Sequence, residues 1–145
     1  MSYQKQIADA IVTALQAVSG APATVEYRKA DVVHKFETLP VCIVTAGFRR
    51  PTGRAFEGTV FYDNGFQVAV YRDCRGDVST ATDLNPLFVQ TAKQALDLPT
   101  LSGLSALVRD VDLVEDQAWE AQAFKDGVEV SRFGLLIRTN EPQNG

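Results

Sequence analysis

The sequence predicts a single α+β domain over residues 1–145, in which a mostly antiparallel β-sheet is packed by two main α-helices. A hairpin is predicted because two β-rich runs, Thr59–Tyr62 and Phe66–Tyr71, flank Asp63-Asn64-Gly65, and Asn-Gly tolerates the positive φ of a tight turn. Apolar residues at helical spacing open the chain and recur in its second half. With 145 residues, 46% of them hydrophobic and 22% charged, the chain can bury its own core. Nothing in this pattern indicates an enzyme.

An amphipathic helix is predicted at the start of the chain. Ile7, Ile11 and Leu15 recur every three or four residues, so they form one stripe of a helix over Gln4–Val18, which Ser19-Gly20 ends. Polar residues interrupt this apolar stretch, which therefore does not resemble a signal peptide. No apolar run approaches the ~20 residues of a membrane-spanning helix, and no membrane partner is expected.

Two strands and an exposed loop are predicted next. The β-rich Thr24–Lys29 suits a short edge strand, and the almost wholly apolar Val41–Phe48 suits a strand covered on both faces. Three arginines, a proline and a glycine mark the following segment, so Arg49–Gly58 is predicted to be a flexible, exposed loop or arm. Because exposed charges contribute little to stability, replacing the three arginines together is expected to leave the thermal midpoint nearly unchanged.

The second half is predicted to hold one helix and two strands. Asn85-Pro86 resembles a helix start, since Asn caps helices and proline at the first helical position lacks only an N–H that would be unpaired anyway. The helix is expected to end at Leu98-Pro99, with strands over Leu104–Val114 and Val128–Thr139. The polar tail, Asn140–Gly145, is expected to be frayed.

The residue types that carry catalysis or bind zinc are sparse. His34 is the only histidine and has no nucleophile motif beside it, so a surface or turn histidine is the favoured interpretation. Cys42 and Cys74 are interpreted as small buried hydrophobic residues in a reducing compartment rather than as a disulfide. One histidine and two separated cysteines do not match the paired spacing of a structural zinc site, and no nucleotide-binding motif occurs. No cofactor is expected.

Acidic residues cluster over Asp110–Asp116. On a strand, Asp110 and Asp112 point the same way, a geometry that could hold a hard cation such as calcium or magnesium. A solvated acidic face next to a turn also explains the cluster and is the favoured interpretation. No metal site is therefore assigned.

The arginine-rich segment is the best candidate for a contact surface. Arginine and aromatic side chains on an exposed loop are typical of protein interfaces, although a loop kept soluble by its charge would have the same composition. The candidate interface residues are Phe48, Arg49, Arg50, Arg54 and Phe56.

Four stretches carry a resemblance to a known family. They are the opening helix IADAIVTALQA, the connection and strand YRKADVVHKFETLPVCIVTAGFRRP, the pair FQVAVYRDC and NPLFVQTAKQALD, and the closing strand SRFGLLIRTNEP. In order, length and texture they resemble the tail-terminator and tail-completion (neck) proteins of long-tailed bacteriophages and their prophages. The resemblance contains no residue-level signature, so it transfers no role to a single position.

The resemblance implies a structural role without catalysis. Proteins of this family form a ring, commonly a hexamer, on the head-proximal end of the tail tube. The ring contacts the tail-tube protein and the head-connector protein, and DNA passes through its lumen. A net charge of −4 suits a lumen that does not grip phosphate. The implied location is the tail or neck of the virion, after synthesis in the bacterial host cytoplasm.

Two alternatives are open at this point. A small ligand-binding module or enzyme subunit would use a pocket between helix and sheet, around Trp119 and Tyr71. Another virion structural protein, such as a head-closure or baseplate protein, would have a similar sequence texture.

Overall fold

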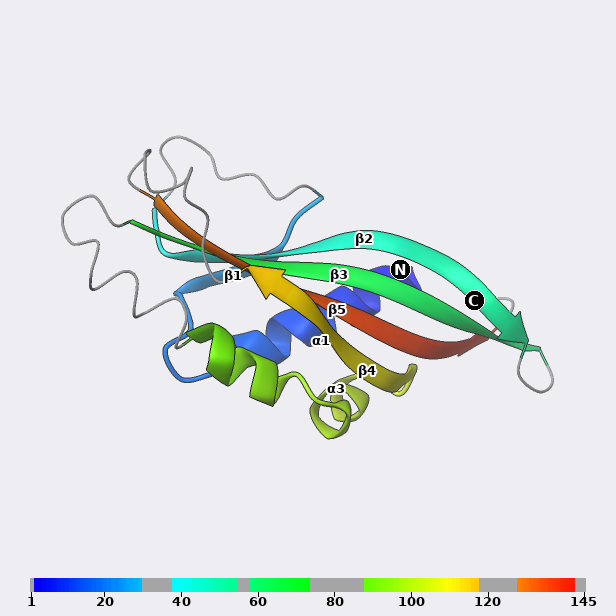
Figure 1. The fold of residues 1–145 in the computed structure, drawn as a ribbon. Coiled ribbons are helices and arrows are strands. Elements are labelled where there is room, and N and C mark those ends of the chain that lie inside the picture. Colours follow the sequence, from blue (N-terminus) through cyan, green and yellow to red (C-terminus); the bar gives the residue numbers. More distant parts are fainter. Residues whose placement is uncertain (1, 30–37, 55–57, 74–87, 118–127, 143–145) are drawn as a thin grey trace.

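The computed structural model describes residues 2–29, 38–54, 58–73, 88–117 and 128–142 (Figure 1). The α+β class predicted from the sequence is confirmed. Helices are α1 (Tyr3–Gln16), a helix over residues 88–95, and α3 (Leu98–Leu104). Strands are β1 (Thr24–Tyr27), β2 (Val41–Arg54), β3 (Thr59–Asp73), β4 (Val108–Gln117) and β5 (Val128–Pro142).

The described strands form one five-stranded sheet in the order β1-β2-β3-β5-β4. The sheet is mixed, because β1 lies parallel to β2 while the other neighbouring pairs are antiparallel. The strand β1 is short and lies at one edge, as the sequence predicted. The central pair, β3 and β5, is in continuous register from Thr59↔Pro142 to Asp73↔Val128.

All the described helices lie on one face of the sheet (Figure 1). The helix α1 begins where the Ser2 hydroxyl accepts a hydrogen bond from the Lys5 N–H at 3.1 Å, a standard N-cap. Its predicted apolar stripe, Ile7, Ile11 and Leu15, is completely buried. The sheet residues in the same core are Val25, Cys42, Val44, Phe66, Val68, Val70, Val108, Phe133, Leu135 and Ile137.

The first part of β2 is covered on both faces, as predicted. Cys42 and Val44 belong to the core beneath the helices, whereas Val41 and Ile43 belong to a smaller cluster on the other face. Cys42 is a buried free thiol, and its burial raises its pKa to about 12. Cys74 lies outside the described residues.

The predicted hairpin at Asp63-Asn64-Gly65 is wrong. These residues lie in the middle of β3, and the antiparallel partner that precedes β3 is β2. Asn64 is fully buried, and its side-chain amide donates to the Ile137 carbonyl at 3.1 Å and to the Thr139 hydroxyl at 3.2 Å. Tertiary hydrogen bonds to β5 therefore hold in a strand a dipeptide whose local preference is a turn.

The loop predicted over Arg49–Gly58 is also wrong for most of its length. Residues up to Arg54 belong to β2, which pairs with β3 through Arg49↔Asn64 and Arg50↔Asp63. Register shifts between Ala46 and Arg49 and between Pro51 and Gly53 mark irregularities in this strand. Residues 55–57, including Phe56, lie outside the described part of the chain.

Several predicted boundaries change. The proline of Leu98-Pro99 stands at the start of α3, whose N-cap Asp97 accepts from the Thr100 N–H at 2.9 Å. The strand predicted from Leu104 begins at Val108. The expected tail is wrong for residues 140–142, which belong to β5. His34 and the predicted helix start at Asn85-Pro86 lie outside the described residues.

Candidate interaction surfaces

The sheet extends beyond the helices at the end where β2 leads into β3 (Figure 1). We call this extension the arm; it comprises Phe48–Arg54 of β2, Thr59–Gly65 of β3 and Ile137–Pro142 of β5. It contains the described candidate interface residues Phe48, Arg49 and Arg50, which the structure brings together. The side chains of Arg54 and Phe56 lie outside the description.

Arg49 holds the arm together from within. Its Nη1 donates to Asn64 Oδ1 and to Glu141 Oε2, both at 2.7 Å, and its Nη2 donates to Glu141 Oε1. The guanidinium carbon lies 4.0 Å from the centre of the Tyr62 ring. Glu141 is only 1% exposed, and it also accepts a hydrogen bond from the Thr139 hydroxyl.

This network gives Arg49 a structural role in the arm. The hydrogen bond to Glu141 raises the pKa of Arg49 above its usual value. A carboxylate as buried as Glu141 needs a charged, hydrogen-bonding partner, and the bidentate guanidinium supplies one. Of the two adjacent arginines, Arg50 is therefore the one available to another molecule, with a side chain that is 70% exposed.

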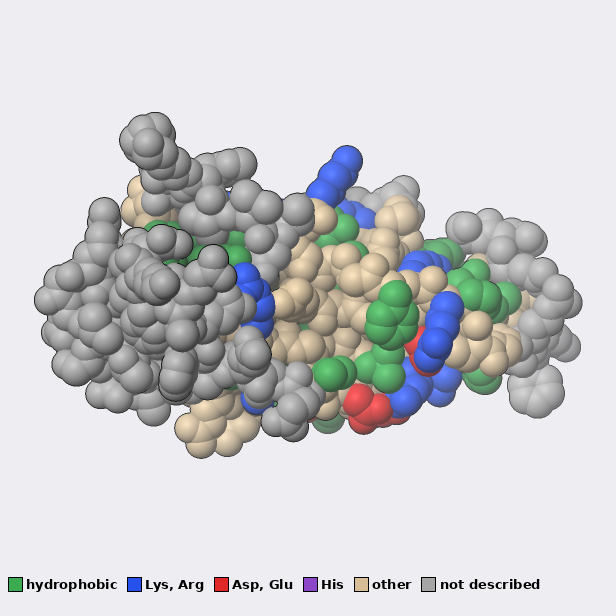
Figure 2. All heavy atoms as spheres, turned by 45° about the horizontal axis from the view of Figure 1, so that its top comes forward, with side chains coloured by type: hydrophobic (Ala, Val, Ile, Leu, Met, Phe, Trp, Pro, Cys, Tyr) green, Lys and Arg blue, Asp and Glu red, His purple; other side chains and the backbone are tan. Residues whose placement is uncertain are grey.

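Charged side chains alternate across the sheet face that points away from the helices. Arg50 of β2 lies 3.9 Å from Asp63 of β3, which lies 3.8 Å from Arg138 of β5. Arg138 in turn donates to Asp110 and Asp112 of β4, at 2.6 Å each. We call this row of five residues the ionic ladder. Figure 2 shows this face, where acidic and basic side chains lie beside hydrophobic ones.

The acidic pair of β4 points the same way, as the sequence predicted. The guanidinium of Arg138 lies between the two carboxylates, in the place that a bound cation would take. The hydrogen bonds to Asp112 and Asp110 raise the pKa of Arg138. In the described part of the chain, no three His, Cys, Asp or Glu side chains are grouped as metal ligands. The geometry thus explains the described acidic pair as partners of an arginine.

Two exposed apolar side chains cover glycines on the same face. A Cβ on Gly65 would lie 2.4 Å from Phe48 Cε1, and a Cβ on Gly134 would lie 3.1 Å from Val114 Cβ. The glycines thus leave the space that these side chains from β2 and β4 occupy. Phe48 is still 48% exposed and Val114 is 50% exposed, so both keep apolar surface that another molecule can cover.

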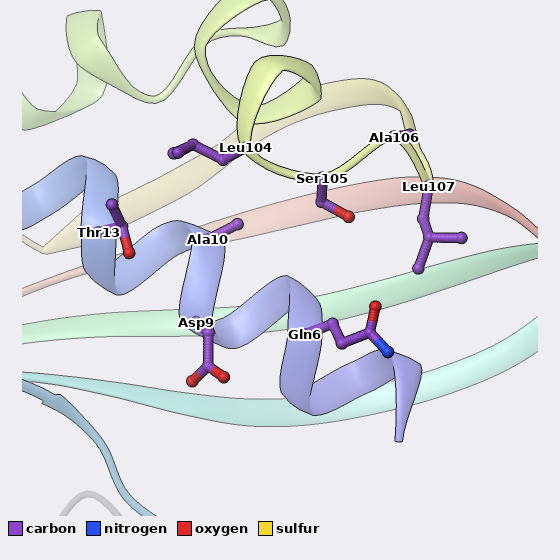
Figure 3. Close-up of a pocket in the computed structure, with 8 residues that line it drawn as sticks. All are labelled: Gln6, Asp9, Ala10, Thr13, Leu104, Ser105, Ala106 and Leu107. Carbon is purple, nitrogen blue, oxygen red and sulfur yellow. The ribbon is translucent and has the colours of Figure 1, made fainter. Parts of the chain in front are cut away.

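Hollows lined by described residues lie on the helical side of the sheet. One, of about 550 Å³, lies between α1 and the segment that follows α3 (Figure 3). It is lined by Gln6, Asp9, Ala10, Thr13, Leu104, Ser105, Ala106 and Leu107. In Figure 3 the Asp9 carboxylate points away from α3, and Asp9 pairs with Lys5 at 2.6 Å.

The second hollow, of about 580 Å³, lies between α1, the helix over residues 88–95, and α3. Its lining is made of small and apolar residues such as Ala14, Val18 and Ala95. Neither hollow contains Tyr71, which lies in the cluster on the other face of the sheet and accepts from Arg132 at 2.9 Å. The described residues thus place Tyr71 on the face of the sheet opposite these two hollows, and Trp119, the other residue named for the expected pocket, lies outside the described residues.

Sequence reasoning missed Asp63 and Arg138, which link the ionic ladder across the central strands. Their opposite charges were visible in the sequence, but the pairing Asp63↔Arg138 joins strands far apart in the chain. Only the register of β3 against β5 makes them neighbours. The same holds for Glu141, which the polar composition of the last six residues predicts to lie in a frayed tail.

The chain is similar to solved structures but not to a known family. The sequence matches no family model and no curated protein. Among solved structures, it is similar to a chain of the particle titled "Virion of native gene transfer agent (GTA) particle". The two chains are 15% identical with a TM-score of 0.44, over 96% of this chain and 95% of the other. No helix in the described ranges is both long and apolar enough to span a membrane.

Proposed function

We propose that this chain is a structural protein of a phage or prophage virion, where it forms a ring that caps the tail tube and joins the tail to the head. The proposal rests on the sequence resemblance to tail-terminator and tail-completion proteins. In this role the protein makes and breaks no bond and uses no metal or cofactor. Its partners are other copies of itself, the tail-tube protein and the head-connector protein.

One observation of the fold carries the proposal: the two edges of the sheet are unlike. At one edge, β1 pairs with only Val41–Val44 of the fourteen-residue strand β2. At the other edge lies β4, with a different sequence and a different length. A ring requires a heterologous contact, in which each copy presents two different surfaces, and unlike edges on opposite sides of one sheet supply them.

The charge of the chain is compatible with DNA passing through the ring. With a net charge of −4, the chain offers no general excess of basic groups to neutralise phosphates. A ring of several such copies would repel the DNA backbone from its lumen rather than bind it. The ring number, taken as six from the resemblance, is part of the proposal.

Size measurement and electron microscopy test the proposal. Native mass spectrometry of the purified full chain is expected to give monomers or weak oligomers when dilute and closed rings at high concentration. With tubes assembled from the tail-tube protein encoded in the same gene cluster, negative-stain images are expected to show a ring at one end of each tube. A protein that stays monomeric at every concentration and leaves tube ends bare would refute the ring.

A small ligand-binding module is the second candidate function. The hollow of about 580 Å³ between the three helices, lined by small and apolar residues, has the volume of a small-molecule site. The discriminating measurement is a thermal-shift screen with apolar metabolites. A saturable rise in the melting temperature together with a strictly monomeric protein would replace the ring proposal.

A further inference from the structure

We infer that neighbouring copies in the ring meet edge to edge, with the acidic strand β4 of one copy against the arginine-bearing outer edge of β2 in the next copy. This inference rests on the proposed ring and names the surfaces that form it. Four observations carry it: the free edges, their opposite charges, the exposure of the charged side chains, and the irregularities of both strands.

In the part of the chain that the structure describes, both strands have an edge with which no other strand pairs. The strand β1 pairs with β2 only through Val44, and no described residue pairs with the outer edge of β2 from Thr45 to Arg54. On the opposite side of the sheet, β4 is the last strand in the order, and it pairs only with β5 among the described strands. Among the described residues, each copy therefore has two open edges, one at β2 and one at β4.

The two edges carry opposite charge. The sequence of β2 contains three arginines and no acidic residue, and because Glu141 of the same copy neutralises Arg49, two of these positive charges are left. The sequence of β4 contains four acidic residues and one arginine, and Arg138 of β5 offsets one of the three net negative charges, so two are left. Opposite charges on facing surfaces steer association and fix its register, whereas like charges disfavour it. A symmetric dimer through two β2 edges or two β4 edges is thus disfavoured, and the head-to-tail contact is favoured.

The charged side chains are accessible for this contact. Arg50 is 70% exposed, and its separation of 3.9 Å from Asp63 leaves room for a shorter contact to a new partner. Asp112 is 56% exposed although it accepts from Arg138. A carboxylate has acceptor sites for several donors, so Asp112 can bind an arginine of another copy without releasing Arg138.

Both edges are too irregular to form a continuous backbone ladder. Register shifts interrupt β2 on either side of Arg49–Pro51, and β4 between Val108 and Asp110 and between Val114 and Gln117. Proline also lacks a backbone donor. Bulges, proline and charge are the features that prevent strand addition at edges. The contact is therefore made by side chains, with the half-exposed Phe48 and Val114 adding apolar area beside the charged groups.

A second copy is the occupant because both complementary surfaces belong to one chain and lie on opposite sides of its sheet. Joining β4 of one copy to β2 of the next leaves each pair with one free edge of each kind. Such a contact repeats until the ring closes.

Two charge-reversal variants test the contact. Arg50→Glu makes the outer edge of β2 less basic, and Asp112→Lys makes β4 less acidic, so each variant alone weakens every contact between its own copies. Each is expected to raise the concentration needed for assembly about tenfold or more. An equal mixture is expected to assemble at close to the wild-type concentration, because the altered β2 edge of one variant meets the altered β4 edge of the other and the unaltered edges meet one another.

The control is an exposed ion pair of similar accessibility on α1. Lys5 and Asp9 are 45% and 46% exposed and lie on neither edge. Lys5→Glu and Asp9→Lys are expected to leave assembly unchanged, alone and mixed. Circular dichroism melts check that every variant is folded.

The outcomes separate this contact from the ring itself. Native mass spectrometry of the mixture reports whether the two variants bind each other, even if no ring forms. Variants that assemble alone as the wild type does, or a mixture that shows no recovery, would overturn the contact while leaving a wild-type ring intact. Mutual binding of the variants without rings of the wild type would support the contact and overturn the proposed function.

Discussion

Replacing Gly65 by alanine should reveal how tightly Phe48 packs onto the sheet. The new Cβ would lie 2.4 Å from Cε1 and 2.6 Å from Cδ1 of the Phe48 ring, so the ring must move. The backbone itself offers no obstacle, because the described glycines with positive φ are Gly20 and Gly58. The expected effect of Gly65→Ala is therefore a direct conflict between two side chains.

The magnitude follows from two opposing contributions. Relieving an overpacked contact costs about 1–3 kcal/mol, and the half-exposed ring of Phe48 can swing outward, so about 1–2 kcal/mol applies here. Replacing a glycine inside a strand by alanine gains about 0.5–1 kcal/mol. Gly65→Ala is thus expected to destabilise the protein by up to about 1.5 kcal/mol. In a Phe48→Ala background the clash is absent, and the same change is expected to stabilise by about 0.5–1 kcal/mol.

A double-mutant cycle in urea measures this change of sign. The four proteins are unfolded at low protein concentration and constant salt, so self-association does not contribute. Gly53→Ala is the matched control, because a Cβ there meets no atom within 4 Å. Effects of Gly65→Ala and Phe48→Ala that add to within about 0.5 kcal/mol would refute the packing of Phe48 over Gly65.

The structure predicts different effects on stability for replacing Arg49 and Arg50, and a loss of stability at alkaline pH that depends on the buried thiol of Cys42. Arg49→Ser is expected to lower the free energy of unfolding by about 2–3 kcal/mol, because it leaves Glu141 buried without its partner, whereas Arg50→Ser should change it by less than about 0.5 kcal/mol. Chemical denaturation measures both, and equal small effects would contradict the internal role of Arg49. The Cys42 thiol keeps its proton in the folded chain up to a pKa of about 12, while in the unfolded chain it ionises from about 9.0. Between these values the wild type should lose stability relative to Cys42→Ala by about 1.4 kcal/mol per pH unit; parallel pH dependences of the two proteins would exclude this.

The sequence was sufficient where local patterns and tertiary structure agree. The helical stripe of α1 needs only its own spacing and the Ser2 cap, and the apolar start of β2 is buried whichever strands flank it. The α+β class followed from such elements. The expectation that replacing all three arginines leaves stability nearly unchanged assumed that all three are exposed. Arg49 does not meet this assumption, because it pairs with the buried Glu141.

The failures share one physical cause, which is a partner far away in the chain. Asn64 bonds to a carbonyl 73 residues later, and Arg49 bonds to a carboxylate 92 residues later. Asn-Gly locally prefers a turn, and a run of arginines is typical of a loop. Hydrogen bonds to these distant partners override both local preferences and hold the residues in strands. No local rule could identify Glu141 as a buried residue, because the polar residues around it are typical of a chain end.

The bulges and the proline at the sheet edges bear on how the protein behaves before it meets its partners. Smooth, open edges would let copies extend one another's sheets without limit, and the product would be an insoluble fibre. Where edges meet only through charged side chains, each contact between two copies has a low affinity, and this affinity falls as the salt concentration rises. In the proposed ring, such weak contacts would let wrongly placed copies dissociate and rebind, and free copies would remain unassembled until a template brings them together.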